Sequence, residues 1–157
     1  MKKQKGFTLI ELLIVIGIIA FLASAIFIAV DPAKRFSESR NARRWTDVSS
    51  ILEGVLEFTV DSAGILPAGI DSVPGTSQQL GTAGSGCDSG CTNGGTTLAA
   101  CLDLTTDLVD TYLSSIPYDP LSGSAGKTDY YLNKSAKGRI TVGACDPELT
   151  ATINVSR

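Results

Sequence analysis

The sequence contains no histidine among its 157 residues. This absence excludes every site that depends on imidazole, such as a Ser–His catalytic pair or a zinc ion held by histidine ligands. Charged residues are also scarce, at 18% against roughly 25% in an average soluble protein. The hydrophobic fraction is ordinary at 43%, so we expect the apolar residues to be concentrated in one part of the chain.

The apolar residues are concentrated near the N-terminus. Residues 7–30 carry only three polar side chains, those of Thr8, Glu11 and Ser24. A helix of this length spans roughly 36 Å, which is enough to cross the ~30 Å apolar layer of a bilayer. A short basic leader, residues 1–6, precedes it. The N-terminus is therefore a targeting or membrane segment, which has to be interpreted before the fold.

Three interpretations of this segment compete. It is a secretory signal peptide removed after Ala25, a permanent single-span anchor, or a membrane segment that is trimmed before Phe7 and retained. Glu11 favours the third, because a carboxylate within an apolar helix costs roughly 2.5–3.5 kcal/mol on insertion scales. Cleavage between Gly6 and Phe7 creates an α-amino group four residues before Glu11. On a neighbouring copy of the chain, that amine would neutralise the carboxylate.

Residues 5–13, with the sequence KGFTLIELL, resemble the N-terminal signature of type IV pilins and of the pseudopilins of type II secretion systems. The resemblance covers about the first fifth of the chain. It implies that a prepilin peptidase cleaves after Gly6 and that the new N-terminal residue, Phe7, is N-methylated. It also implies that Glu11 pairs with the terminal amine of the adjoining subunit during filament assembly.

The same resemblance implies a location and a set of partners. The precursor would lie in the bacterial inner membrane as a single-pass protein, with its leader in the cytoplasm and its head outside. Its partners would be membrane lipid before assembly, the prepilin peptidase, an inner-membrane assembly platform, and copies of itself in a filament. The assembled form would be a cell-surface pilus or a periplasmic pseudopilus.

An Asp-Pro pair ends the apolar run. Proline removes a backbone hydrogen bond inside a helix, so the helix either kinks or restarts with Asp31 as N-cap and Pro32 in first position. Residues 31–60 then show apolar steps of three and four, which predict an amphipathic helix that ends near residues 61–64. The predicted buried stripe consists of Trp45, Val48, Leu52, Val55, Leu56 and Thr59.

Basic residues gather at 34–44, and none follows until Lys127. We interpret this cluster as a solvated helix face next to the membrane; contacts with nucleic acid or lipid are less favoured. A further interpretation is that these bases meet acidic residues of neighbouring subunits. Ten acidic residues lie between Arg44 and Lys127: Asp47, Glu53, Glu57, Asp61, Asp71, Asp88, Asp103, Asp107, Asp110 and Asp119.

The remaining residues, 61–157, predict a small globular head. Residues 61–100 are rich in Gly, Ser and Thr and read as loop. A short helix is expected within 104–113, a rigid proline turn at 116–123, a hairpin from 129–133 and 139–144, and a strand within 149–156. We therefore expect an α+β fold, in which a long N-terminal helix packs on an antiparallel sheet of three or four strands, as in pilins.

The head contains four cysteines, an even number in a part of the chain that we expect to be exported: Cys87, Cys91, Cys101 and Cys145. An oxidising compartment favours two disulfides. Three pairings are possible, and we favour Cys101–Cys145 together with Cys87–Cys91. A metal site is less favoured because the cysteines do not form two Cys-x-x-Cys pairs.

No catalytic constellation is evident, so we expect neither an enzyme nor a cofactor. Because some pseudopilin heads bind calcium in a turn, the resemblance makes Asp119 and Asp129 candidate calcium ligands, but no dense loop of oxygen ligands supports them. The leading hypothesis is a structural subunit of a type IV pilus, and the alternatives are a pseudopilin or a soluble binding protein released by a conventional signal peptidase. The part after residue 60 has five basic and ten acidic residues, which argues against strong nucleic-acid binding.

Overall fold

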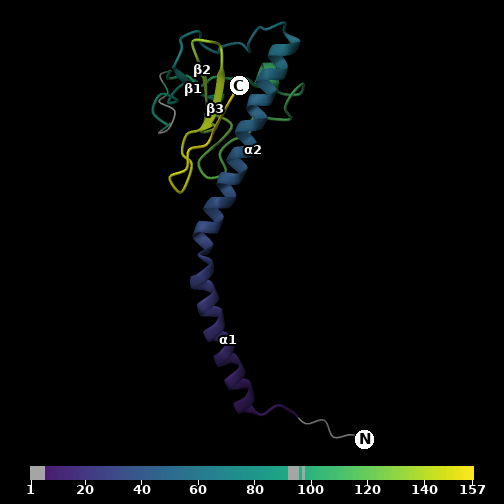
Figure 1. Ribbon diagram of the computed structural model, residues 1–157, viewed down its shortest axis with the longest axis vertical. Coiled ribbons are helices and arrows are strands. Elements are labelled where there is room, and N and C mark those ends of the chain that lie inside the picture. The colour runs from purple at the N-terminus through teal and green to yellow at the C-terminus, as the bar shows by residue number, and fades with distance from the viewer. Residues whose placement is uncertain (1–5, 92–95, 97) are drawn as a thin grey trace, which may run out of the picture. The chain divides into compact units, whose positions relative to one another are not determined.

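The computed structural model describes residues 6–91, 96 and 98–157. The chain divides into two compact units, of which the first ends at Phe36 and the second runs from Ser37 to Arg157. Most of the predicted leader, residues 1–5, lies outside the described residues. The ribbon of the described chain is shown in Figure 1.

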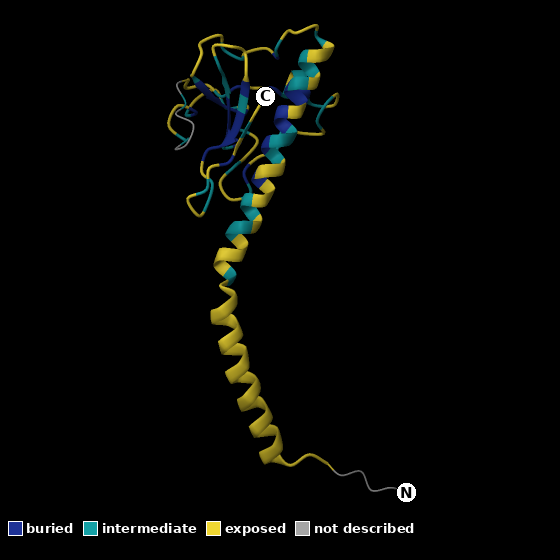
Figure 2. Cartoon of the chain, in the orientation of Figure 1, coloured by how far each residue is buried: buried dark blue, intermediate teal, exposed yellow. Residues whose placement is uncertain are grey.

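The first unit contains α1, Leu9–Val30, which is coloured as exposed along its length in Figure 2. Every residue of α1 is exposed, although its side chains are almost all apolar. By length and composition α1 is able to cross a membrane, a property that signal sequences share. Since an exposed apolar helix is unfavourable in water, lipid or other protein has to cover α1.

The second helix, α2, spans Pro32–Asp61. The backbone N–H of Lys34 donates to Asp31 Oδ1 at 3.3 Å, which is the contact of an N-cap residue with the third helical position. A helix that restarts at Pro32 was one of the two sequence-based alternatives, and the structure selects it. The end of α2 at Asp61 also agrees with the sequence, because the following Gly64 adopts a φ of +93° that favours glycine.

The second unit is a four-stranded antiparallel sheet with α2 on one face (Figure 1). The strands lie in sequence order: β1 (Ser77–Gln79), β2 (Tyr130–Lys134), β3 (Ile140–Ala144) and β4 (Asn154–Ser156). A short helix, α3 (Thr105–Leu108), completes the regular structure. The α+β, pilin-like fold and the β2–β3 hairpin predicted from the sequence are confirmed.

The core lies between α2 and the sheet. Leu132 of β2 is opposite Val142 of β3, and both side chains belong to the same buried cluster as Val48 and Ile51 of α2. The opposite face of the sheet is polar, with hydroxyl and amide side chains in one cross-strand row: Ser77, Asn133, Thr141 and Ser156. Neighbouring positions along each strand thus face opposite sides of the sheet, and of this polar row Ser77 is itself buried.

Three local expectations were wrong. Trp45 was predicted to lead the buried stripe but is 44% exposed, and Arg44 beside it is buried instead. β1 was missed because its residues are polar and lie in a segment rich in glycine and serine, yet it is buried by pairing with β2. α3 and β4 are both shorter than the sequence patterns indicated.

The four cysteines form two disulfides, but the favoured pairing was wrong. The bonds are Cys87–Cys101 and Cys91–Cys145, rather than Cys101–Cys145 and Cys87–Cys91. The cause is a backbone pairing that the sequence does not reveal: Cys87 N–H donates to the carbonyl of Ala99 at 3.0 Å. This contact brings Cys87 beside Cys101, and Cys91 is then joined to the residue that follows β3.

Candidate functional site

The N-terminal candidate site begins just before α1. Gly6, Phe7 and Thr8 have no regular secondary structure, and Phe7 is 89% exposed. The peptide bond between Gly6 and Phe7 therefore lies outside the helix. A protease acts on extended backbone, so this bond is accessible in the conformation observed.

Glu11 sits in the first turn of α1 and forms a capping box with Thr8. The Thr8 backbone N–H and hydroxyl each donate to Glu11 Oε2 at 2.8 Å, and Glu11 N–H donates to Thr8 Oγ1 at 3.3 Å. The positive end of the helix dipole lies at the same place and favours a carboxylate. This local role was not predicted, although the Thr-x-x-Glu spacing indicates it.

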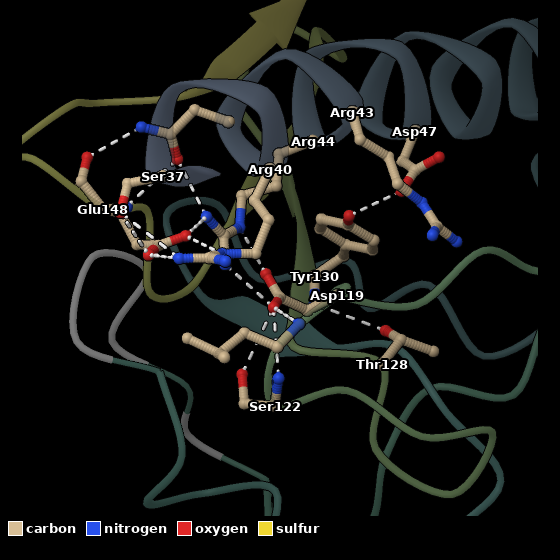
Figure 3. Close-up of polar contacts among 12 residues, drawn as sticks. Ser37, Arg40, Arg43, Arg44, Asp47, Asp119, Ser122, Thr128, Tyr130 and Glu148 are labelled. Atoms are coloured by element: carbon tan, nitrogen blue, oxygen red, sulfur yellow. Dashed lines mark hydrogen bonds and ion pairs between the residues drawn. The ribbon is translucent and has the colours of Figure 1, made fainter. Parts of the chain in front are cut away.

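The second group of interacting polar side chains lies between α2 and two loops of the head (Figure 3). Its centre is Arg44, whose Nε and Nη2 donate to the two carboxylate oxygens of Asp119 at 2.5 and 2.9 Å. Both side chains are completely buried. Such a bidentate pair is a strong, directional contact, and it leaves no free charge in the interior.

Asp119 is held in its ionised form within this pair. Burial raises the pKa of its carboxyl, but hydrogen bonds from Arg44 and from the backbone N–H groups of Leu121 and Ser122 outweigh burial and leave the pKa below its ordinary value. The hydrogen bonds with Asp119 raise the pKa of the Arg44 guanidinium, although burial opposes its charged form.

Glu148 extends the group on the side of the loop after β3. Arg40 Nη2 donates to it at 2.5 Å, Arg44 Nη1 at 2.8 Å and Ser37 Oγ at 2.9 Å. The hydrogen bond from Arg40 contributes most to lowering the pKa of Glu148 to about 2. We call Ser37, Arg40, Arg44, Asp119 and Glu148 the ion-pair cluster.

A separate contact joins α2 to the sheet. Tyr130 of β2 donates its hydroxyl to Asp47 Oδ2 at 2.8 Å, and Arg43 Nε lies 3.6 Å from the same oxygen. Burial, followed by the contact with Asp47, raises the pKa of Tyr130. Together with the ion-pair cluster, this contact fixes the position of α2 on the head.

These contacts correct the interpretation of residues 34–44 as a solvated face for Arg40 and Arg44, whereas Lys34, Arg35 and Arg43 are exposed as expected. Arg44 is buried and Arg40 is engaged by Glu148 within the same chain. The spacing of four between Arg40, Arg44 and the core residue Val48 is a signal that these arginines lie on the buried face. This spacing was not interpreted as a buried face, because arginine is rarely buried unless it is paired.

One comparison with known proteins matches the N-terminal segment. Residues 1–27 match the family described as "Prokaryotic N-terminal methylation motif". The chain carries the N-terminal methylation motif typical of type IV pilins and pseudopilins. Neither the comparison with curated proteins nor the comparison with solved structures found a match.

The methylation motif gives this prepilin-like chain general properties. Proteins with the motif are processed by a prepilin peptidase, reside in the inner membrane before assembly and are assembled into filaments. Families of this kind are generally not enzymes. The motif does not distinguish a pilin from a pseudopilin, and the head of the prepilin-like chain lies outside the matched residues.

The two candidate calcium ligands have different surroundings in the head. Asp119 forms an ion pair with Arg44, whereas Asp129 accepts a hydrogen bond from Gln79 Nε2 at 2.8 Å. Burial raises the pKa of Asp129, which disfavours its charged form. Among residues 6–91, 96 and 98–157, no group of three or more acidic or cysteine side chains is arranged to hold a metal ion.

Proposed function

We propose that the chain is a pilin, the structural subunit of a type IV pilus. In this proposal the peptidase cleaves between Gly6 and Phe7, and Phe7 is N-methylated. Residues 7–30 serve as membrane anchor and then as polymerisation helix, residues 31–60 connect this helix to the head, and residues 61–157 form the disulfide-linked head. The observation that carries the proposal is the methylation motif at the start of a fully exposed apolar helix.

The exposure of α1 supports a change of surroundings during assembly. Before assembly lipid covers the helix, and afterwards the α1 helices of neighbouring copies do so through apolar packing. A membrane-embedded carboxylate at Glu11 is unfavourable unless a positive partner is close. The terminal amine of a processed neighbouring copy supplies that partner and sets the axial register of the filament.

The first test is the mature N-terminus of the protein purified from its host membrane or from sheared filaments. Mass spectrometry is expected to detect a chain that starts with N-methylated Phe7. A chain that starts at Ile26 would instead identify a conventional signal peptide and a soluble secreted protein.

The second test is replacement of Glu11. Glu11→Leu makes the segment more apolar, so membrane insertion is expected to be retained, whereas filament yield should fall because the amine of the neighbouring copy loses its partner. Ser24→Ala is the matched control, because its hydroxyl donates only to Phe21 of the same helix at 2.8 Å. Wild-type amounts of filament from Glu11→Leu would contradict the pairing.

A pseudopilin of a type II secretion system remains the second candidate, because the same motif occurs in both classes. The two disulfides and the loop-rich head favour the pilin. Electron microscopy of a deletion strain discriminates between them. Loss of surface filaments supports a pilin, and loss of protein secretion with surface filaments intact supports a pseudopilin.

A further inference from the structure

A hollow of about 330 Å³ lies on the head at the C-terminal end of α2. It is lined by Leu56, Glu57, Val60, Asp61 and Tyr112. Its walls are apolar, with Val60 78% exposed, and its two carboxylates are both exposed. The hollow thus combines apolar walls with two acids at its edge.

The carboxylates of this hollow lack a cationic partner among residues 6–91, 96 and 98–157. No ion pair between described residues includes Glu57 or Asp61. Asp61 Oδ2 accepts a hydrogen bond from the Tyr112 hydroxyl at 2.9 Å, and Tyr112 packs edge-on against Phe58 of α2. These contacts fix both the tyrosine and one acid in position, so the hollow is formed before any ligand arrives.

Such a hollow fits the side chain of lysine or arginine. The methylene stem of either residue packs against apolar walls while its cationic head stays near water. The two carboxylates supply the counter-charge, and the Tyr112 ring offers a cation–π contact. A neutral side chain would gain nothing from the two carboxylates, and an acidic side chain would be repelled by them.

The head presents basic side chains of this kind at one turn. Three of the five basic residues after position 60 lie in the β2–β3 hairpin: Lys134, Lys137 and Arg139. The turn is well ordered, because Gly138 adopts a φ of +83° and the backbone N–H of Arg139 donates to Ser135 Oγ at 2.9 Å. Lys137 and Arg139 are exposed, and neither forms an ion pair with another described residue.

We propose that the hollow at Glu57 and Asp61 receives Lys137 or Arg139 from the β2–β3 turn of a second copy of the chain. The hollow and the turn are different surfaces of one molecule, so their contact is heterologous and repeats from copy to copy. A heterologous contact that does not close into a ring generates a helical filament. The inference rests on the proposed function and adds to it a head-to-head contact outside the apolar helices.

The experiment uses the full chain expressed in its host, with charge reversals on each side of the contact. One variant carries Glu57→Lys and Asp61→Lys, another carries Lys137→Glu and Arg139→Glu, and a third carries all four changes. Asp88→Lys is the control, because Asp88 is also an exposed acid but lies far along the sequence from the hollow. Sheared filaments are quantified against the amount of disulfide-bonded subunit in the membrane.

Each one-sided reversal is expected to lower filament yield at least about fivefold, since like charges then face each other across every copied contact. The variant that carries all four changes should recover most of the filament yield, and the yield of Asp88→Lys should match that of the wild type. Unchanged yield in both one-sided variants, or no recovery in the combined one, overturns the contact and leaves the proposed function standing. An absence of filaments from the unaltered chain overturns both.

Discussion

Arg44 shows how one buried charge organises the head. Its guanidinium is fully buried on α2, where a run of apolar residues would otherwise be expected, and Asp119 and Glu148 share its hydrogen bonds. Because a charge in the protein interior is unfavourable without a partner, this residue requires that both loops pack against α2 in one arrangement. The cluster thus specifies the position of the loops as well as contributing to stability.

The first prediction concerns Asp119. Asp119→Ala leaves Arg44 buried without its bidentate partner, and the expected loss in free energy of unfolding is about 3–5 kcal/mol. Arg43→Ala is the control, since Arg43 is 57% exposed and its contact with Asp47 is 3.6 Å long; its expected effect is below about 1 kcal/mol. Urea unfolding of the full chain in detergent, followed by the fluorescence of its single tryptophan, measures both.

Comparison with the control shows which result would contradict this prediction. If Asp119→Ala and Arg43→Ala lowered the free energy of unfolding equally, the pair between Arg44 and Asp119 would have no special role in the head. Trp45 is a suitable probe because it follows Arg44 on α2 and is partly exposed, so that detachment of α2 from the head alters its surroundings.

The second prediction concerns acid stability. The pKa of Glu148 is about 2 in the folded head against an ordinary value of 4.5. A lowered folded-state pKa means that the carboxylate stabilises the head fully above about pH 4.5, and that this contribution is lost as the pH falls towards 2. Glu148→Gln should therefore reduce stability at pH 7 and flatten the loss between pH 4.5 and 2.

Unfolding midpoints in urea, measured across this pH range for both proteins, test the expectation. Glu53→Gln serves as control, because Glu53 is exposed and has no ion pair among the residues that the structure covers. An equally steep pH dependence in wild type and Glu148→Gln would exclude the Arg40–Glu148 contact as its source.

Single residues differ in how far the sequence alone predicts their surroundings. The motif that contains Gly6, Phe7 and Glu11 was recognised because its local spacing carries the information, and the first 27 residues match a known family. The cleavage, methylation and pairing assigned to these three residues stay predictions. The partners of Arg44 were not predicted, because Asp119 lies 75 positions away and the chain contains many other acids. Contacts of this range depend on the folded head and have no local signal.

At the scale of elements, alternation and turn residues predicted the β2–β3 hairpin, and the Asp-Pro pair predicted either a kink or the start of a new helix at Pro32, of which the structure has the second. Both signals are local. β1 was not predicted because Ser77, Gln78 and Gln79 have low strand propensity and gain their burial only by pairing with β2. This pairing joins residues far apart in the sequence, so no local pattern indicates it.

The third prediction compares the two disulfides. Cys91–Cys145 closes a loop of 54 residues and Cys87–Cys101 a loop of 14. In the chain-entropy view a longer loop constrains the unfolded state more, so removal should cost about 4 kcal/mol for the first bond and about 3 kcal/mol for the second. The double variants Cys91→Ser/Cys145→Ser and Cys87→Ser/Cys101→Ser, compared in urea unfolding, measure this order. A greater loss from the shorter loop would show that native contacts, rather than loop closure, determine the effect.

For the whole molecule, the functional information is unevenly distributed along the chain. The N-terminal segment matches a methylation motif typical of type IV pilins and pseudopilins, whereas the head has an α+β, pilin-like fold and no match among the curated proteins or the solved structures. The head therefore has to be assigned by its own chemistry. Its net charge after residue 60 is negative, its hollow and hairpin carry side chains of opposite charge, and its candidate calcium ligands Asp119 and Asp129 are already bonded to Arg44 and Gln79.

The fourth prediction uses calcium to test the pilin assignment, since a calcium-dependent head would favour a pseudopilin. Calcium requires six to eight oxygen ligands, and within the described part of the chain Asp119 is occupied by Arg44 while Asp129 is bonded to Gln79. The thermal unfolding midpoint of the full chain should therefore be the same in EDTA and in millimolar calcium. A calcium ion bound at a hundred times its dissociation constant would instead raise the midpoint by on the order of 10 °C. Magnesium at the same concentration controls for ionic strength, and a rise with calcium alone would favour the pseudopilin.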